Sequence, residues 1–357
     1  MFLLSMKLFL IFFSLILTAP VFSQTSNTVD TVRATLPDIA RTASFDGVIK
    51  TKFETSVETA AMRFNVRNSR VGVRGDIGAF LSYRVQVELS NEGAFQPLDL
   101  FGTLKPTRNL HFLFGQQNIP FDNNYVISPG EMMFANRTFV GKFFTPGTRD
   151  MGAVAQYRFR IGNLPMEGQA GMFNGGRINE PQWADKTSFA FRLIAGSMDG
   201  FRTTAKVYRY NRDPMGNNPE IDYFFWGVDA RYANSRLRVE TEMMKRHSFN
   251  DGMNLLGGYI QGAYTFDLPN PDAMFRILTP AIRIDAMGYD VGNSGFEVAR
   301  LTAGLKFGLT FLPFDSLLRI DYEQYFTEAN LVFPDFRPGR DDHVTDNKVT
   351  IELIVRF

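Results

Sequence analysis

Apolar and polar residues alternate along many short segments of this chain. In the segment 81–89, LSYRVQVEL, every odd position is apolar or aromatic and every even position is polar. Successive side chains of a β-strand point to opposite faces, so such a segment predicts a strand with one apolar and one polar wall. The same alternation recurs around residues 110–114, 150–158, 189–193, 236–242, 300–309 and 318–323. The chain is therefore expected to be all-β.

The connections between these segments are of two kinds. Short turns rich in Gly, Asn, Pro and Asp occupy residues 105–109, 161–163, 197–200 and 233–235, and longer polar stretches occupy 174–185, 211–220, 246–254 and 327–347. Short turns at one end and long loops at the other are typical of membrane-spanning β-barrels, whose apolar side chains face lipid. The spacing predicts a transmembrane antiparallel β-barrel of about 16 strands.

Composition narrows the classes of function. Phenylalanine accounts for 36 of the 357 residues, and cysteine is absent, which excludes disulfide bonds and thiolate metal sites. The three histidines, His111, His247 and His343, lack metal-ligand spacing. A net charge of +1 points to no particular partner. We expect no enzyme activity, no catalytic residues, no metal, no cofactor and no nucleic-acid partner.

The first residues have the layout of a secretory signal. Lys7 precedes the apolar run Leu8–Leu17, and small residues follow as far as Ser23. The run is shorter than the ~20 residues that a membrane-spanning helix needs, so we expect a signal peptide at residues 1–23. A short N-terminal segment, residues 24–41, would then precede a single barrel domain at residues 42–357.

The segment Val349–Phe357 forms one more alternating strand. One face carries Val349, Ile351, Leu353, Val355 and Phe357. Ile354 is the only apolar residue on the other face. This pattern resembles the C-terminal assembly signal of bacterial outer-membrane β-barrels. The resemblance implies a location in the bacterial outer membrane, contact with its lipid, and recognition of Phe357 by the barrel assembly machinery.

The segment Gln116–Asp150 interrupts the strand rhythm for 35 residues. Connections of this length are normally functional or disordered. Disorder is disfavoured by the apolar residues of the segment, which are Ile119, Phe121, Tyr125, Met132, Met133, Phe134, Phe139, Phe143 and Phe144. We expect this loop to fold inward against the lumen wall, where it would narrow the channel.

Four motifs carry a resemblance to a known family. The sequence LFGQQNIPF at 113–121 resembles the Gly-Gln-x-x-x-Pro-Phe motif that opens the third loop of the phosphate-selective porin O and P family, and RDMG at 149–152 resembles the end of that loop. RNSRVGVRG at 67–75 resembles the family's second strand, and MFNGG at 172–176 resembles a hairpin of the family. The resemblance implies a 16-stranded homotrimeric barrel that passes small anions such as phosphate.

Eight basic residues are the candidate channel and anion-binding site. Arg63, Arg67, Arg70, Arg74 and Arg84 lie in two adjacent predicted strands, and Arg137, Lys142 and Arg149 lie in the third loop. Arg and Lys in a lumen set anion preference, and the guanidinium binds phosphate oxygens in pairs without losing its charge. Arg67 and Arg70 both face inward only if the strand bulges near Asn68–Ser69.

Two alternatives stay open from the sequence. The arginines can instead form ion pairs with Glu88, Asp76 and Glu54 that fix the shape of the wall. Further acidic residues are also predicted to face the lumen: Glu240, Glu242, Asp321 and Glu323. The alternatives to an anion channel are a non-selective general porin and a non-conducting barrel with a structural or adhesive role.

Overall fold

The computed structural model describes residues 41–121, 127–145, 147–176, 178–181, 183–213, 220–269, 274–289, 291–309, 316–327, 343 and 345–357. The predicted signal peptide and residues 24–40 lie outside this part of the chain, as does most of the connection 327–347. Within it, no helix is both long and apolar enough to cross a membrane.

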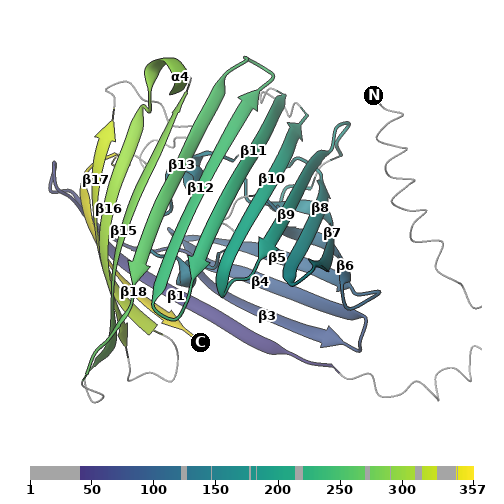
Figure 1. Cartoon of the computed structure of the whole chain (residues 1–357), viewed down its shortest axis with the longest axis horizontal. Helices are drawn as coiled ribbons and strands as arrows, with labels where there is room; N and C mark the ends of the chain where they lie inside the picture. Colours follow the sequence, from purple (N-terminus) through teal and green to yellow (C-terminus); the bar gives the residue numbers. More distant parts are fainter. Residues whose placement is uncertain are drawn as a thin grey trace, which may run out of the picture. The chain divides into compact units, whose positions relative to one another are not determined.

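Antiparallel strands make up most of the described residues (Figure 1). Their bounds are β1 (Ser44–Ser56), β2 (Met62–Val66), β3 (Ser69–Ile77), β4 (Leu81–Asn91), β5 (Ala94–Leu104), β6 (Leu110–Asn118), β7 (Arg149–Ile161), β8 (Leu164–Phe173), β9 (Ser188–Gly196), β10 (Gly200–Arg212), β11 (Ile221–Ala233), β12 (Leu237–Ser248), β13 (Asn254–Tyr264), β14 (Phe266–Asp267), β15 (Phe275–Tyr289), β16 (Val298–Leu309), β17 (Ser316–Thr327) and β18 (Lys348–Arg356). The short helices are η2 (Pro129–Glu131, a 3₁₀ helix), α3 (Phe139–Phe143) and α4 (Val291–Ser294).

The 18 strand segments of the described chain make 16 barrel strands, because two strands are interrupted. β2 and β3 both pair with β1 and are two halves of one strand. Likewise, β13 and β14 both pair with β15. Successive strands pair in order, and β1 pairs with β18 from Val48↔Arg356 to Ser56↔Lys348, which closes the barrel. The predicted antiparallel barrel is confirmed.

The break between β2 and β3 contains the predicted bulge. Asn68 has a φ of 54°, and the register of β3 against β4 shifts between Ser69 and Arg70. Asn adopts this left-handed conformation more readily than most residues. As a result, Arg67 and Arg70 lie on the same inner face although they are three positions apart.

The wall is apolar outside and charged inside. On β17, Ile320 and Tyr322 point outward and are 38% and 40% exposed, whereas Arg319, Asp321 and Glu323 point inward and are each 1% exposed. The predicted inward acids Glu88, Glu240 and Glu242 are likewise buried. An apolar outer wall of this extent requires lipid rather than water around it.

The seam of the barrel is built on a close contact between Phe357 and Gly47. The amide of Gly47 donates to the carbonyl of Phe357 at 2.7 Å, and the amide of Phe357 donates back at 3.1 Å. A Cβ at Gly47 would lie 2.3 Å from Cζ of the Phe357 ring. The ring therefore occupies the space that any other residue at position 47 would need.

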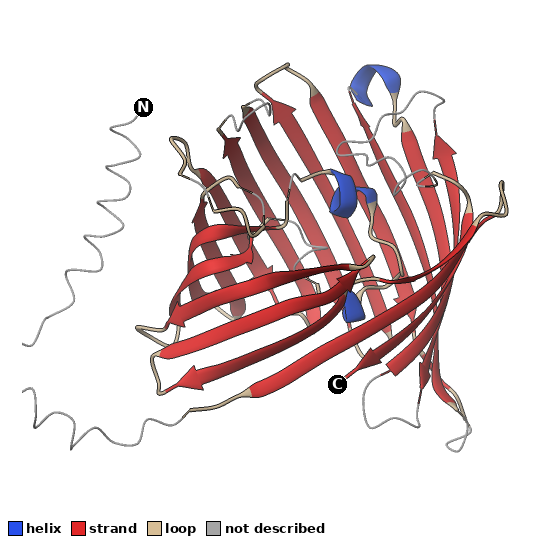
Figure 2. Ribbon diagram, turned by 180° about the vertical axis from the view of Figure 1, so that it is seen from behind, coloured by secondary structure: helices blue, strands red, loops and turns tan. Residues whose placement is uncertain are grey.

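The third loop, which joins β6 to β7, folds into the barrel. Figure 2 shows its helices α3 and η2 between the walls. Thr138 caps α3, because its Oγ1 accepts a hydrogen bond from the amide of Gly141 at 3.1 Å. Four phenylalanines of the described loop are at most 2% exposed: Phe121, Phe134, Phe139 and Phe144. The predicted inward fold is confirmed.

Candidate functional site

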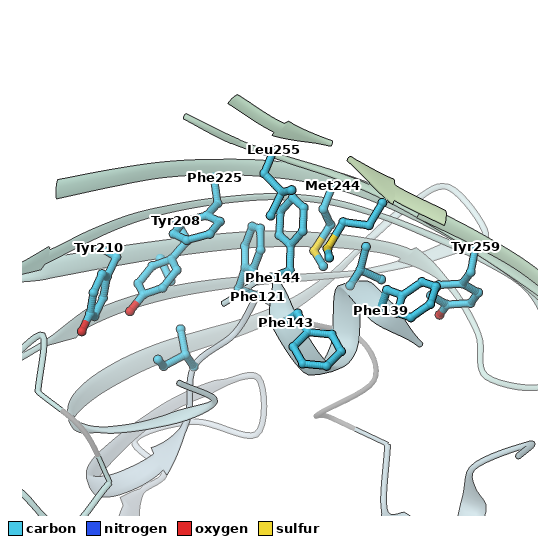
Figure 3. Close-up of a cluster of buried hydrophobic side chains, with 14 of the residues drawn as sticks. Phe121, Phe139, Phe143, Phe144, Tyr208, Tyr210, Phe225, Met244, Leu255 and Tyr259 are labelled. Carbon is cyan, nitrogen blue, oxygen red and sulfur yellow. The ribbon is translucent and has the colours of Figure 1, made fainter. Parts of the chain in front are cut away.

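Aromatic packing holds one side of the third loop to the inner wall (Figure 3). The ring of Phe121 lies 5.8 Å from that of Tyr208 on β10 and 5.6 Å from that of Phe225 on β11. Phe144 packs on Phe225 as well, at 6.1 Å. Burying one such side chain contributes about 1.5–3 kcal/mol. The loop therefore has a hydrophobic core of its own against β10 and β11.

Arginines of the wall hold the other side of the loop by its backbone. Arg319 Nη1 donates to the carbonyl of Met132 at 2.7 Å, Arg283 Nη1 to that of Asn136 at 3.0 Å, and Arg300 Nη2 to that of Arg137 at 2.7 Å. Hydrogen bonds from charged donors are about twice as strong as neutral ones. Alternation in the sequence predicts that Arg300 and Arg319 point inward, but it does not predict their role in fixing the loop. Arg283 was not singled out by the sequence.

Carboxylates of the same wall complete the attachment. Asp321 accepts from the amide of Ala135 at 2.7 Å, and Asp285 accepts from the amide of Phe139 at 2.8 Å. Arg300 is itself balanced by Asp285 at 2.8 Å and by Glu323 at 2.9 Å. The charged side chains of this wall thus form ion pairs with one another and hydrogen bonds with the loop backbone.

Asn136 links the loop to two strands of the wall. Its side-chain oxygen accepts from Lys52 Nζ of β1 at 2.9 Å, and its amide donates to Glu323 of β17 at 3.2 Å. Sequence patterns do not predict this role, because both partners lie far away along the chain.

A cavity of about 280 Å³ lies between the loop and the wall formed by β1, β2 and β16–β18. Among the described residues, six cationic side chains line it: Arg63, Arg67, Arg137, Lys142, Arg300 and Lys348. Three described carboxylates line it: Glu54, Glu92 and Asp346. Because Arg300 is balanced by Asp285 and Glu323, the positive excess of the described lining rests on the other five cations.

Four of the eight predicted site residues meet in this cavity. Arg63 and Arg67 come from the wall, and Arg137 and Lys142 come from the loop. Arg63 donates to Glu54 at 2.8 Å, and both arginines approach Glu92 at 3.6 Å. Lys142 Nζ lies 4.5 Å from the centre of the Phe143 ring.

The other four predicted residues do not line the cavity. Arg70 is buried and pairs with Glu88 at 3.1 Å, as one alternative in the sequence analysis proposed, and Arg149 pairs with Asp99 at 2.7 Å. Arg84 forms an ion pair with Asp46. Arg74 of β3 lies directly opposite Arg84 of β4 and is exposed. The proposed partner Asp76 instead binds Lys105.

Lys348 and Asp346 are among the cavity residues that were not predicted as site residues. Lys348 donates to the carbonyl of His343 at 2.7 Å. Burial raises the pKa of Asp346, but hydrogen bonds from Ser56 and His343 and the charge of Lys348 outweigh burial and hold that pKa below its usual range. Asp346 therefore carries its negative charge at neutral pH. Alternation predicts that Lys348 points inward. It does not predict how far along the barrel axis Lys348 lies, and so does not place it beside the loop.

Comparison with known proteins identifies the fold. No family model and no curated protein matches the sequence. Among solved structures, the outer membrane channel DcaP of Acinetobacter baumannii is 13% identical with a TM-score of 0.61, covering 89% of this chain and 97% of that one. An anion-selective porin from Comamonas acidovorans is 9% identical with a TM-score of 0.61, covering 89% and 99%. The trimer form of OmpT from Vibrio cholerae is 14% identical with a TM-score of 0.58, covering 89% and 100%.

The chain has the fold of bacterial outer-membrane porins and channels. Together with the apolar outer wall, this is the architecture of a protein of the bacterial outer membrane. The charged inner wall and the cavity beside the third loop make that lumen-facing cavity the candidate functional site.

Proposed function

We propose that the protein is an outer-membrane porin whose water-filled channel passes small anions through the constriction beside the third loop. The observation that carries this proposal is the lining of the cavity, in which the described residues include six cationic side chains and three carboxylates. Rings of Arg and Lys favour anions in pores. Low-dielectric walls strengthen the field of such charges beyond its value in bulk water.

The loop attachments support a constriction of fixed width. Aromatic packing on β10 and β11 and arginine contacts from β15–β17 hold the loop from two directions. A loop held in this way keeps Arg137 and Lys142 facing Arg63 and Arg67 across the cavity.

Charge reversal on both sides of the cavity tests the proposal. In planar bilayers, Arg63→Glu/Lys142→Glu should move the reversal potential in a salt gradient toward cations, and high salt should weaken the shift by screening. Arg70 is unsuitable for this test, because it does not line the cavity and its side chain is only 10% exposed beside Glu88. The Arg63 side chain is 47% exposed, so a glutamate at position 63 stays solvated beside Glu54. The control is Arg236→Glu, since Arg236 lies in the turn between β11 and β12, is 62% exposed in its side chain and pairs with Asp267 of β14.

The outcomes separate the alternatives. A variant that folds normally, as judged by heat-modifiable migration on a gel, but keeps the wild-type reversal potential would remove these residues from the conduction path. Absence of conductance in the wild-type protein would instead favour the non-conducting structural or adhesive barrel.

We further propose phosphate among the permeating anions and a homotrimeric assembly. Both rest on the motif resemblance to phosphate-selective porins, which the residues GQQNIPF and RDMG carry. Phosphate competition with chloride current and the mass of the detergent-solubilised complex are the corresponding measurements.

A further inference from the structure

The cavity beside the third loop is lined by aromatic side chains as well as by cationic ones. The Phe139 ring lies 6.0 Å from the Tyr325 ring in an edge-on arrangement and 6.5 Å from the Phe143 ring. All three aromatic residues line the cavity. They come from two elements, the loop helix α3 and the strand β17.

Cations are placed over these rings. Arg300 lies 4.6 Å from the centre of the Phe139 ring, and Lys348 lies 5.1 Å from that of Tyr325. Together with Lys142 above Phe143, this makes a surface in which positive charge and aromatic carbon alternate over short distances.

The cavity is larger than a compact inorganic anion needs. Its volume of about 280 Å³ lies close to the lower end of the ~300–1,000 Å³ typical of small-molecule sites. A site for a small, strongly hydrated anion would need polar donors on all sides. This cavity offers donors on some sides and aromatic or aliphatic carbon on others, as in pockets that orient an apolar ligand body by a few polar groups.

From this combination we infer that the cavity binds organic anions with an apolar body, of the class of aromatic carboxylates, in preference to inorganic anions. The carboxylate would lie among Arg63, Arg67, Arg137 and Lys142, and the apolar body would lie against the edges of Phe139 and Phe143. This inference rests on the proposed porin function and specifies the solute that the channel retains longest.

Current inhibition in planar bilayers tests the inference. Chloride current through the wild-type channel is titrated with benzoate, acetate and phosphate at constant ionic strength and neutral pH. Benzoate and acetate carry the same charge and differ in their apolar body. Partial burial of that body should give half-inhibition at a concentration about tenfold lower for benzoate than for acetate.

Variants locate the binding site. Arg137→Gln/Lys142→Gln removes two charged donors, so the half-inhibiting concentration of benzoate should rise about tenfold or more. Arg236→Gln, in the exposed β11–β12 turn region, should leave it unchanged. Phe143→Leu keeps an apolar side chain and should reduce the ratio between benzoate and acetate with little effect on acetate itself.

The possible results are decisive. Equal inhibition by benzoate and acetate, stronger inhibition by phosphate, or no inhibition at all would overturn the inference while leaving a conducting channel. A protein that folds but never conducts would instead contradict the proposed function.

Discussion

Removal of the Phe144 ring should loosen the third loop without opening the barrel. Phe144 is 0% exposed and packs on Phe225, which belongs to the strand wall. Replacement of a fully buried Phe by Ala costs about 3–5 kcal/mol. Since 1.4 kcal/mol changes an equilibrium tenfold, Phe144→Ala should raise the ratio of detached to attached loop by about two to three and a half orders of magnitude.

The assay is single-channel recording together with heat-modifiable gel migration. Mean conductance and current noise should both increase, because a loop that leaves the wall widens the constriction. Gel migration should stay that of a folded barrel, because the strand pairing from β1 to β18 does not involve the loop. The matched control is Phe201→Ala, since Phe201 is 61% exposed and lies on β10.

One result would refute this reasoning. If Phe144→Ala conducts with wild-type amplitude and noise, then the aromatic cluster does not hold the loop in place, or the loop does not set the bore. A variant that fails to fold would show that the loop core supports the barrel itself.

Further predictions concern the seam between Gly47 and Phe357 and the tip of the third loop around Asn136. Gly47→Val should lower the yield of folded barrel, because a side chain at Gly47 would collide with the Phe357 ring; Phe357→Asp should lower it too, and folded protein on a gel measures both. Wild-type yield of Gly47→Val would show that the seam tolerates displacement of that ring. Asn136→Ala removes side-chain hydrogen bonds to charged partners, each worth about 1.5–3 kcal/mol, so it should raise current noise; unchanged noise would mean that backbone contacts alone fix the tip.

The sequence was sufficient for the barrel because lipid and water impose a period of two on each strand. The inward position of the third loop was also predictable, since its apolar residues had to pack somewhere. Ile354 is an apolar residue on the otherwise polar inner face of β18. This exception is compensated locally, because Ile354 packs with Val48 and Leu317.

Which arginines line the constriction was not predictable from the sequence alone. Arg67 and Arg74 both lie on the inner face of interrupted strands, yet only Arg67 reaches the height of the loop. That height depends on the register of neighbouring strands, which alternation does not specify. Arg283 and Arg300 donate to the backbone of Asn136 and Arg137, which lie 147 and 163 residues away along the chain.

The reversal potential of the wild-type channel in a potassium chloride gradient tests the central claim most directly. Potassium and chloride ions have similar mobilities in water, so the sign of this potential reports the charge preference of the constriction. The excess of cationic side chains among the described residues of the cavity predicts that chloride permeates better than potassium, so the reversal potential should have the sign of an anion-selective channel. The magnitude of this potential should decrease as the total salt concentration rises, because salt screens the charges. A potential of zero or of the opposite sign would contradict an anion-selective channel.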